Sequence, residues 1–423
     1  MHRFKIFTFY LLFLSGFYAL EGKTSIENDS KVGYFLSVDG KRFNVKGAAS
    51  EGDHLEILKG FGGNTIRTWA IDEKTLDAAH KMGLKVVAGI WLEHMRHDED
   101  YDYNDDEFIN KQRKKVVSLV KKFKDHPALL AWGLGNEVEL HVPNDMLKTI
   151  WSEVNTIAEL VKSVDPNHPI VTSVAGFNQQ KINYIKQYYP LCEILGVNGY
   201  GFAHKVGKLL LEYGWEKPYM ITEFGPLGTW EVGDKTDWGV VIEESSHEKA
   251  KRYLRAYNAA MNESPNYCLG VFPFFWSNKQ ETTSTWYGMF LKNGARTEAV
   301  DAMAYAWNGE YPDNRVPEIH SISSSAKFKE VKRWSTHTAD IQVIDPENDP
   351  LEYRWVIMDE SKVKSVGGDF EPTPKSYPKL ILENNGNKVK FKTPWRKGPY
   401  RLFAYVEDDN RGAATVNFPF YVK

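Results

Sequence analysis

Two glutamates, each at the end of a short apolar run, are the residues of this sequence best suited to chemistry. Glu137 follows Asn136 at the end of LLAWGLGNE, residues 129–137, and Glu223 ends PYMITE, residues 218–223. Two carboxylates that face each other across a cleft can break a glycosidic bond, one as acid and the other as nucleophile or base. A lone glutamate leaving a strand is more often a solvated turn residue, so the interpretation depends on what gathers around the pair.

Side chains suited to holding a sugar and a carboxylate follow other apolar runs: Arg67, Trp91, His94, Tyr200 and Trp276. We expect Arg67 and the Tyr200 hydroxyl to keep Glu223 ionised, while the negative charge of Glu223 raises the pKa of Glu137. Glu223 would then attack the sugar, and Glu137 would protonate the leaving oxygen. A separation of roughly 5 to 5.5 Å, which suits retention of configuration, is expected between them.

An alternation of strand and helix patterns can bring these side chains to one rim. Eight apolar runs are each followed by a segment with helical spacing, which predicts a (β/α)8 TIM barrel over residues 33–308. The carboxyl ends of all strands in such a barrel meet at one mouth. A doubly wound sheet is the alternative, but no Gly-rich phosphate loop follows the first run. The predicted strands are 43–49, 64–70, 84–92, 129–134, 169–175, 193–200, 218–224 and 269–276, preceded by a hairpin over 34–45 that turns at Asp39-Gly40.

The C-terminal quarter of the chain has a different pattern. Residues 308–317 (NGEYPDNRVP) have the composition of a linker, and beyond them apolar and polar residues alternate between turns. This pattern predicts an all-β, immunoglobulin-like sandwich over residues 316–423, with strands near 339–343, 352–358, 388–391, 400–407 and 414–422. The sandwich could support the barrel or bind carbohydrate. Trp334, Trp355 and Trp395 could form a sugar platform or fill the core, and the core is favoured for Trp355.

Composition excludes several classes of protein. The 423 residues contain 53 Lys plus Arg against 56 Asp plus Glu, a net charge of -3, which does not indicate nucleic-acid binding. Cys192 and Cys268 are the only cysteines, and two separate buried thiols are expected rather than a disulfide scaffold. No cofactor and no metal ion are predicted, and a monomer that binds a polysaccharide or oligosaccharide is expected.

The N-terminus resembles a targeting segment. MHRFK is followed by an uncharged apolar run over residues 6–20, which is short for a membrane span. We interpret residues 1–22 as a signal peptide, which predicts a secreted, periplasmic or cell-surface protein without an integral membrane segment. A retained N-terminal anchor is the alternative.

The segments WGLGNE and ITEFG resemble the acid/base and nucleophile motifs of the clan A retaining β-glycoside hydrolases, and LGNE with TEFG is most similar to the family 2 type of barrel. The resemblance covers residues 43–307. It implies the acid/base role for Glu137, the nucleophile for Glu223, and a contact from Asn136 to the sugar 2-hydroxyl. It also implies that Arg67 and Tyr200 support the nucleophile, and it places a non-proline cis peptide at Trp276-Ser277.

The order of the domains bears on the substrate. Family 2 enzymes carry β-sandwiches before the barrel, whereas a barrel followed by a sandwich resembles the secreted endo-β-1,3-glucanases of glycoside hydrolase family 158. Cellulase-type members carry proline after the acid/base glutamate, whereas Val138 follows Glu137 here, which argues against that group. The resemblance implies hydrolysis of internal bonds in β-1,3-glucan by double displacement. The alternatives are a mannanase, an exo-acting β-glycosidase or transglycosylase, and a glycan-binding barrel without activity.

Other residues each allow two interpretations of their role. Glu139 could act as the acid, but no asparagine precedes it. The loop 93–107 is rich in carboxylates, and a solvated rim is favoured over a Ca²⁺ site because the spacing of an EF-hand loop is missing. His94 and His97 lack a third metal ligand in register, so a sugar contact or solvation is expected. Trp230 and Trp286 lie in long loops after the seventh and eighth predicted strands, where they could stack on sugar rings or pack beneath the loop.

Overall fold

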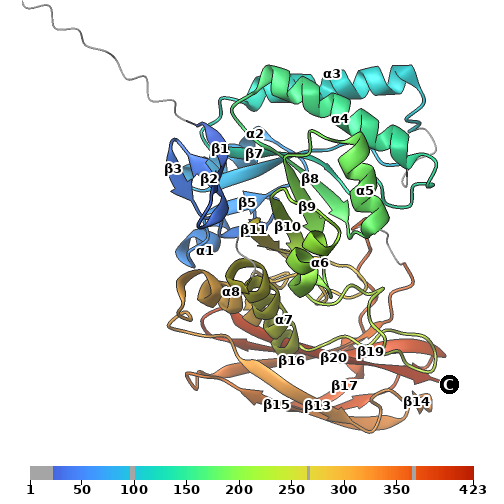
Figure 1. Cartoon of the computed structure of the whole chain (residues 1–423). Coiled ribbons are helices and arrows are strands. Elements are labelled where there is room, and N and C mark those ends of the chain that lie inside the picture. The colour runs from blue at the N-terminus through green and yellow to red at the C-terminus, as the bar shows by residue number, and fades with distance from the viewer. Residues whose placement is uncertain (1–21, 96–100, 264–266, 364–367) are drawn as a thin grey trace, which may run out of the picture.

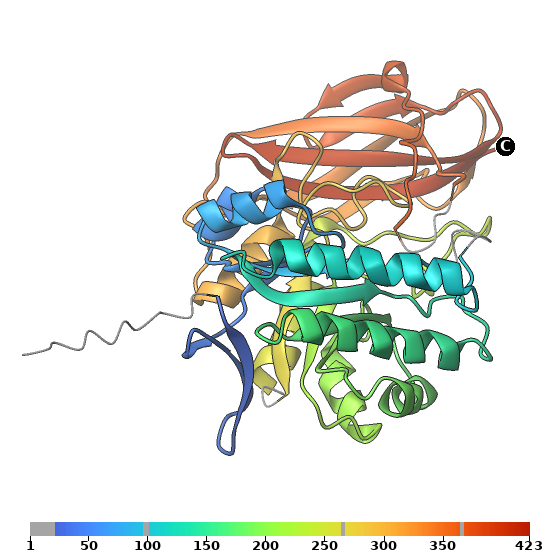
Figure 2. The ribbon, with the colours of Figure 1, turned by 90° about the horizontal axis from the view of Figure 1, so that it is seen from above.

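The computed structural model describes residues 22–95, 101–263, 267–363 and 368–423. Figures 1 and 2 show a barrel, coloured blue to yellow, beside a β-sandwich, coloured orange to red. The predicted fold class, a TIM barrel followed by an all-β sandwich, is confirmed. In the part of the chain that the structure describes, no helix is long and apolar enough to cross a membrane.

The barrel is built from eight parallel strands that pair in the order of the chain. Buried apolar residues fill most positions of these strands, as expected for a sheet covered on both faces. All eight predicted strands are present. They are β4 (Gly47–Ala49), β5 (Thr65–Arg67), β6 (Lys85–Ile90), β7 (Leu129–Asn136), β8 (Ile170–Ala175), β9 (Ile194–Asn198), β10 (Tyr219–Phe224) and β11 (Cys268–Pro273).

Two glycines allow the first and last strands of the barrel to approach each other. A Cβ atom on Gly47 of β4 would lie 2.4 Å from the ring of Phe272 in β11. A Cβ atom on Gly270 of β11 would likewise lie 2.7 Å from the side chain of Val45. Since real contacts of this kind stay beyond about 3 Å, only glycine permits this packing at the seam of the barrel.

Helices surround the barrel, and several begin at a side chain that caps a free backbone N–H group. Asp72 accepts from the Thr75 amide, Asn178 from the Lys181 amide and Ser245 from the Glu248 amide. The helices are α1 (Leu55–Gly60), α2 (Glu73–Lys81), α3 (Asp106–Phe123), α4 (Leu147–Val164), α5 (Gln179–Tyr188), α6 (Val206–Glu212), α7 (Ser246–Asn258) and α8 (Glu298–Asn308), with short turns of helix at η1 (Ala203–Lys205), η2 (Ala259–Glu263) and η3 (Pro378–Leu380).

An antiparallel sheet precedes the barrel. It consists of β1 (Thr24–Asp29), β2 (Gly33–Val38) and β3 (Lys41–Phe43), and the predicted turn at Asp39-Gly40 joins β2 to β3. Leu36 of β2 packs in one cluster with Leu130, Val171 and Ile194, which lie at the starts of their strands. This small sheet therefore covers the amino-terminal end of the barrel, opposite the mouth. Strand β1 was not predicted.

The sandwich consists of two sheets around a second hydrophobic core. All five predicted strands are present, within β15, β16, β18, β19 and β20. One sheet contains β12 (Arg296–Thr297), β20 (Gly412–Val422), β19 (Gly398–Asp408) and β16 (Leu351–Asp359), with β14 (Glu330–Val331) paired to β20. The other contains β13 (Glu318–Ser324), β15 (Thr336–Ile344), β18 (Lys388–Lys392) and β17 (Ile381–Asn385). Strand β12 precedes α8 in the chain, so a segment of the barrel contributes a strand to the sandwich.

Buried polar contacts join the two domains. The carboxylate of Glu243, in the loop after β10, accepts hydrogen bonds from Asn417 of the sandwich (2.6 Å), Lys249 of α7 (2.5 Å) and Thr283 (2.7 Å). Arg401 of the sandwich donates to the backbone oxygen of Val241 in the same loop (2.9 Å). The sandwich thus supports the loop between β10 and α7, which borders the mouth of the barrel.

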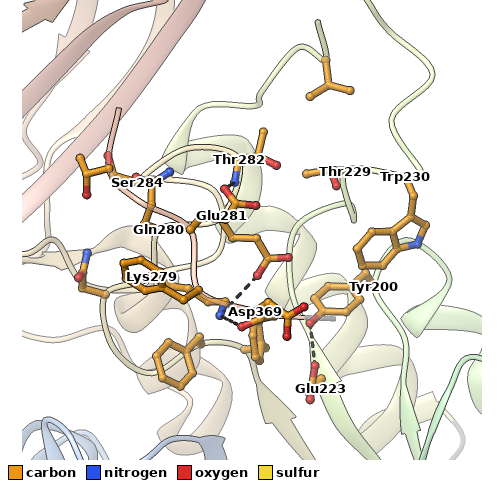
Figure 3. A pocket seen from close by; sticks show the side chains of 18 of the residues that line it. Tyr200, Glu223, Thr229, Trp230, Lys279, Gln280, Glu281, Thr282, Ser284 and Asp369 are labelled. Carbon is orange, nitrogen blue, oxygen red and sulfur yellow. Dashed lines mark hydrogen bonds and ion pairs between the residues drawn. The ribbon is translucent and has the colours of Figure 1, made fainter. Parts of the chain in front are cut away.

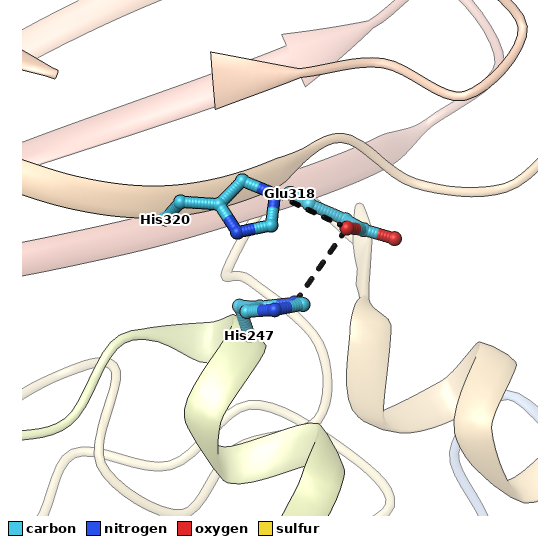
Figure 4. A group of neighbouring side chains, drawn as sticks. All are labelled: His247, Glu318 and His320. Atoms are coloured by element: carbon cyan, nitrogen blue, oxygen red, sulfur yellow. Dashed lines mark ion pairs between the residues drawn. The ribbon is translucent and has the colours of Figure 1, made fainter. Parts of the chain in front are cut away.

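A cluster of histidines and glutamates lies at another point of this interface. His247 at the start of α7 contacts Glu298 of α8 at 2.9 Å, and it faces Glu318 of β13 at 3.8 Å (Figure 4). His320 also faces Glu318, at 3.4 Å. Burial and the neighbouring Glu318 raise the pKa of Glu298 to about 9, so this carboxyl group holds a proton at neutral pH.

The remaining expectations concern cysteine and tryptophan. Cys192 and Cys268 are two separate buried thiols, as expected. Trp355 lies in the core of the sandwich, as expected, with 4% of its surface exposed. Trp334 and Trp395 are exposed on the sandwich and lie near each other, with ring centroids 6.2 Å apart.

Candidate active site

Glu223 lies near the carboxyl end of β10 and is held by three hydrogen-bond donors. Its Oε1 accepts from Arg67 Nη1 and from Trp69 Nε1, both at 3.0 Å, and its Oε2 accepts from the Tyr200 hydroxyl at 2.8 Å. Only 5% of Glu223 is exposed. One cationic and two neutral donors are thus aimed at a buried carboxylate.

The ionisation of the neighbouring groups suits this arrangement. Burial lowers the pKa of Arg67, while the carboxylate of Glu223 opposes that effect, so the buried guanidinium keeps its charge next to an anion. Burial, and then the negative charge of Glu223, raise the pKa of Tyr200 well above its usual value. The Tyr200 hydroxyl therefore keeps its proton and remains a donor to Glu223.

Glu137 follows the last residue of β7 in a left-handed backbone conformation, with φ of 54°. Such a conformation costs about 1 to 2 kcal/mol for a residue other than glycine. It is fixed here by the hydrogen bond from the Glu137 amide to the backbone oxygen of Ser173 at 2.8 Å. Strained residues that the surrounding structure holds in place gather at functional sites, and Glu137 lines the large cavity at the barrel mouth.

A chain of hydrogen bonds connects the two glutamates. Arg67 Nη2 donates to Asn136 Oδ1 at 2.6 Å, and Asn198 Nδ2 donates both to the same oxygen at 3.1 Å and to Glu137 Oε1 at 2.8 Å. Thr222 fixes the orientation of the Asn198 amide by donating to its Oδ1 at 2.8 Å. Because Asn136 Oδ1 takes two donors, the Nδ2 group of Asn136 is the part of this amide that can donate to a ligand.

Glu137 and Glu223 line a cavity of about 1910 Å³. In Figure 3 the Tyr200 hydroxyl points to Glu223 and Trp230 lies beside Tyr200, while Lys279 and Glu281 lie across the cavity. Residues of the sandwich, among them Arg354 and Tyr405, complete the wall on the far side. The cavity is therefore formed by both domains.

Comparison with known families identifies this type of barrel. The description "Glycosyl hydrolases family 2, TIM barrel domain" matches residues 40–272, which is more than half of the chain. The chain belongs to glycosyl hydrolase family 2.

Among curated proteins, this family 2 chain is similar to a mannan endo-1,4-β-mannosidase F of Aspergillus clavatus, with 26% identity over 138 residues that cover 28% of the chain and 30% of that protein. It is also similar to a β-galactosidase of Vibrio cholerae, with 24% identity over 149 residues that cover 34% of the chain and 14% of that protein. The chain spans less than a third of the length of either relative.

Among solved structures, the family 2 chain is similar to a β-glucuronidase of Bacteroides uniformis, with a TM-score of 0.53 and 14% identity over 95% of the chain and 48% of that protein. It is also similar to a β-D-glucuronidase of Dictyoglomus thermophilum, with a TM-score of 0.51 and 16% identity over 69% of the chain and 54% of that protein. At such low identity, these two likenesses show the fold alone.

Most of the predicted site residues meet at the barrel mouth of this family 2 fold. Those that line the cavity are Asn136, Glu137, Glu223, Tyr200, Trp91 and Trp230. Arg67 is 3% exposed and lies behind Glu223, which it contacts from the last position of β5. Trp230 is 68% exposed, so its ring is available to a ligand.

Three rings predicted to contact the sugar, those of Trp276, Trp286 and His94, are buried and do not line the cavity. For Trp286 this agrees with the alternative, packing beneath the loop. Trp276 is fully buried, and its Nε1 donates to the backbone oxygen of His54 at 3.3 Å. Trp286 is 3% exposed and donates to the backbone oxygen of Leu227 at 2.9 Å. His94 is 1% exposed and stacks on Trp91, with ring centroids 4.6 Å apart. His94 therefore supports one face of the Trp91 ring.

The structure also bears on the predicted cis peptide bond and on the role of Glu139. The non-proline cis peptide lies between Phe274 and Phe275, two residues before the predicted position at Trp276-Ser277. Glu139 was considered as an alternative acid, but its Oε1 accepts from Lys181 Nζ at 2.6 Å and from the Ala175 amide at 2.9 Å. These contacts hold Glu139 away from the cavity, so Glu137 is the carboxylate that faces it. His97 and part of the acidic loop lie outside the described residues.

Several residues at the mouth were absent from the predicted site. Trp69 and Asn198 lie at or just beyond strand ends, so the rule that strand ends meet at the mouth places them there, but no role at the site was predicted for them. Lys279 and Glu281 lie in the loop after β11, and the Thr282 amide donates to Glu371 of the sandwich at 2.7 Å. No local pattern in the sequence connects that loop to a segment about ninety residues away.

Proposed function

We propose that this protein is a retaining β-glycosidase in which Glu223 is the nucleophile and Glu137 the acid/base. The observation that carries the proposal is the hydrogen-bonded chain from Glu223 through Arg67, Asn136 and Asn198 to Glu137. It connects two carboxylates at one cavity in unlike surroundings, which suits a pair that divides the nucleophile and acid/base roles.

The surroundings support this division of roles. Arg67, Trp69 and Tyr200 donate to Glu223 and hold its carboxylate in place for attack. In the first step the Glu223 carboxylate attacks the anomeric carbon, and Glu137 gives its proton to the departing glycosidic oxygen. In the second step Glu137 takes a proton from water, and the oxygen of that water displaces Glu223 from the sugar. Two inversions give net retention.

The size of the cavity supports a polymeric substrate. Sites for drug-sized ligands occupy about 300 to 1,000 Å³, whereas this cavity has about 1910 Å³ and opens to solvent. Trp91 and Trp230 offer aromatic faces on which sugar rings can stack. We therefore infer that the enzyme binds several sugar units and cleaves internal bonds.

For the substrate we propose β-1,3-glucan, because a barrel followed by a sandwich is the arrangement of the endo-β-1,3-glucanases of glycoside hydrolase family 158. β-Mannan is the second candidate, since the chain shares 26% identity over 138 residues with a protein named mannan endo-1,4-β-mannosidase F. Both substrates fit the same mechanism, so the walls of the cavity must decide between them.

The test is incubation of the purified protein with laminarin-type, mixed-linkage β-glucan and mannan substrates. A ladder of oligosaccharides from the laminarin-type glucan supports the proposal, and a ladder from mannan alone favours the second candidate. A single released sugar contradicts internal cleavage. An inverted anomer in the first product rules out Glu223 as nucleophile, and no activity on any β-linked glycan overturns the function as a whole.

We also propose that the protein is secreted. The basic MHRFK and the apolar run after it support this proposal, because such a segment is typical of a signal peptide. The measurement is the distribution of the protein between the producing cells and the fraction outside them, together with its N-terminal sequence. A mature N-terminus near residue 22 agrees with the proposal, and an intact Met1 contradicts it.

A further inference from the structure

Three aspartates of the sandwich meet where it joins the linker from the barrel. Asp345 and Asp349 lie in the turn between β15 and β16, and Asp408 ends β19. One carboxylate oxygen from each of the three lies within 4.8 Å of the others. Two separate turns of the sandwich therefore direct acidic groups to one point.

The two buried aspartates each use one oxygen to shape their own turn. Asp345 Oδ1 accepts from the amides of Glu347 at 3.1 Å and Asp349 at 2.8 Å. Asp408 Oδ1 accepts from the amides of Asn410 at 2.8 Å and Gly412 at 2.6 Å. Each carboxylate is thereby fixed, and the position of its second oxygen is fixed with it.

The second oxygens are buried without a partner. Asp345 and Asp408 are each 8% exposed, and the Oδ2 atom of each accepts no hydrogen bond from any residue that the structure describes. A buried polar atom without a partner costs roughly 1 to 3 kcal/mol, and more when it carries charge. Two such oxygens beside a third carboxylate indicate that a ligand is missing between them.

The charge of the cluster indicates a cation. Within the described ranges, no lysine or arginine lies within 4.0 Å of the three carboxylates. The nearby Arg296 pairs with Asp301 at 2.9 Å, and Arg315 pairs with Glu347 at 3.6 Å. Three acidic side chains therefore meet in this part of the described chain without a basic side chain in contact with their carboxylates.

We propose that Asp345, Asp349 and Asp408 bind one calcium ion. Ca²⁺ takes six to eight oxygen ligands at about 2.3 to 2.6 Å, so two oxygens on opposite sides of the ion lie about 4.8 Å apart. Three carboxylate oxygens within 4.8 Å of one another can therefore contact one such ion. The donors are all oxygens, which disfavours Zn²⁺, and Ca²⁺ accepts an irregular set of ligands more readily than Mg²⁺, which demands near-ideal octahedral geometry. Water and backbone oxygens would complete the coordination.

The position of this site suggests what the ion does. Asn314 of the linker donates to Asp349 at 2.5 Å, and Arg296 of β12 donates to the backbone oxygens of Asn314 (2.8 Å) and Asn410 (3.0 Å). An ion bound here therefore fixes both turns against the segment that connects the sandwich to the barrel. This inference does not depend on the proposed catalytic function. It also differs from the sequence-based expectation, which includes no metal ion and which weighed Ca²⁺ only for the loop 93–107.

The experiment uses the full-length protein after removal of divalent ions with a chelator. Isothermal titration with CaCl₂ should show one ion bound per chain, and the melting temperature should rise with the logarithm of the Ca²⁺ concentration above the dissociation constant. MgCl₂ at the same concentration should give a clearly smaller shift. Both signals should disappear in Asp345→Asn and Asp408→Asn.

Asp409→Asn is the matched control, because Asp409 lies in the same turn as Asp408 and carries the same charge, but it is exposed and outside the cluster. This variant should bind Ca²⁺ like the unmodified protein. If Asp408→Asn does not fold, Asp349→Asn takes its place, since Asp349 is only partly buried. The proposal is overturned if the chelated, folded protein binds no Ca²⁺, if the variants of the cluster bind it normally, or if Asp409→Asn loses it equally.

Discussion

Replacement of Glu223 by glutamine tests the proposed nucleophile with little change in shape. In Glu223→Gln the side-chain oxygen can still accept from Arg67 and Trp69, and the new amide can donate to the Tyr200 hydroxyl, which is able to accept. The hydrogen bonds are kept, and the negative charge is lost. Since an amide cannot form the covalent intermediate, turnover should fall by about 10⁴-fold or more.

The same change should reduce stability by a limited amount. Arg67 and Glu223 form a buried ion pair, with 3% and 7% of their side chains exposed. Removing one partner of such a pair costs about 3 to 5 kcal/mol, and the retained hydrogen bonds favour the lower end. At roughly 2 °C per kcal/mol for a chain of this size, the melting temperature should fall by about 6 °C. The protein therefore stays folded at the temperature of the assay.

The assay measures release of reducing sugar from the glycan that the unmodified protein cleaves best, together with the thermal melting curve. Glu153→Gln is the matched control, because Glu153 of α4 is a buried partner of Arg113 of α3 and does not line the cavity. It should lose stability and keep turnover. The reasoning fails if Glu223→Gln keeps more than a small percentage of its turnover while folded, or if Glu153→Gln loses activity to the same extent.

Four further changes have expected outcomes. Glu137→Gln should slow hydrolysis most for substrates with poor leaving groups, and added azide should restore turnover of activated substrates and give a glycosyl azide with retained configuration, detectable by NMR. Burial raises the pKa of Glu281 from 4.5 to about 7, so this group contributes stability below pH 4.5 that is lost as the pH rises to 7. In Glu281→Gln the free energy of unfolding, measured with denaturant, should therefore change less over that pH interval than in the unmodified protein. Trp230→Ala should raise KM about fivefold and leave kcat unchanged, because it removes an exposed stacking surface worth about 1 kcal/mol; a changed kcat with unchanged KM would contradict this role. Deletion of residues 316–423 should give insoluble protein, because Glu243 and the loop after β10 lose their partners; soluble protein with full activity would show that the barrel is independent.

The barrel and the centre of its site could be predicted because both follow from local patterns and one geometric rule. Apolar runs separated by helical spacing indicate the eight strands, and the rule that strand ends meet at one mouth brings Glu137 and Glu223 together although they are far apart in the chain. Arg67 and Tyr200 were found by the same rule. Their contacts with Glu223 are those expected from the need to stabilise a buried anion.

The errors concern features that depend on tertiary packing. Trp276 and Trp286 have the residue type that stacks on sugars, but whether such a ring faces a cavity or packs beneath a loop depends on neighbours distant in sequence. Strand β12 has two residues and no periodicity of its own, and it is defined by its pairing with β20. The three aspartates of the sandwich belong to two turns about sixty residues apart, and only the folded sandwich brings them together.

The pairing of β12 with β20 has a consequence for the order in which the chain can fold. Arg296 pairs with Gly412 and Thr297 with Ala413. Strand β12, which precedes the last helix of the barrel, therefore has its partner in β20, close to the C-terminus. During synthesis on the ribosome, the seven earlier strand–helix units can assemble while the sandwich is still being made. The pairing of β12 with β20 can form only when the chain is nearly finished. The barrel and the sandwich are therefore expected to unfold as one cooperative unit, with a single transition in calorimetry.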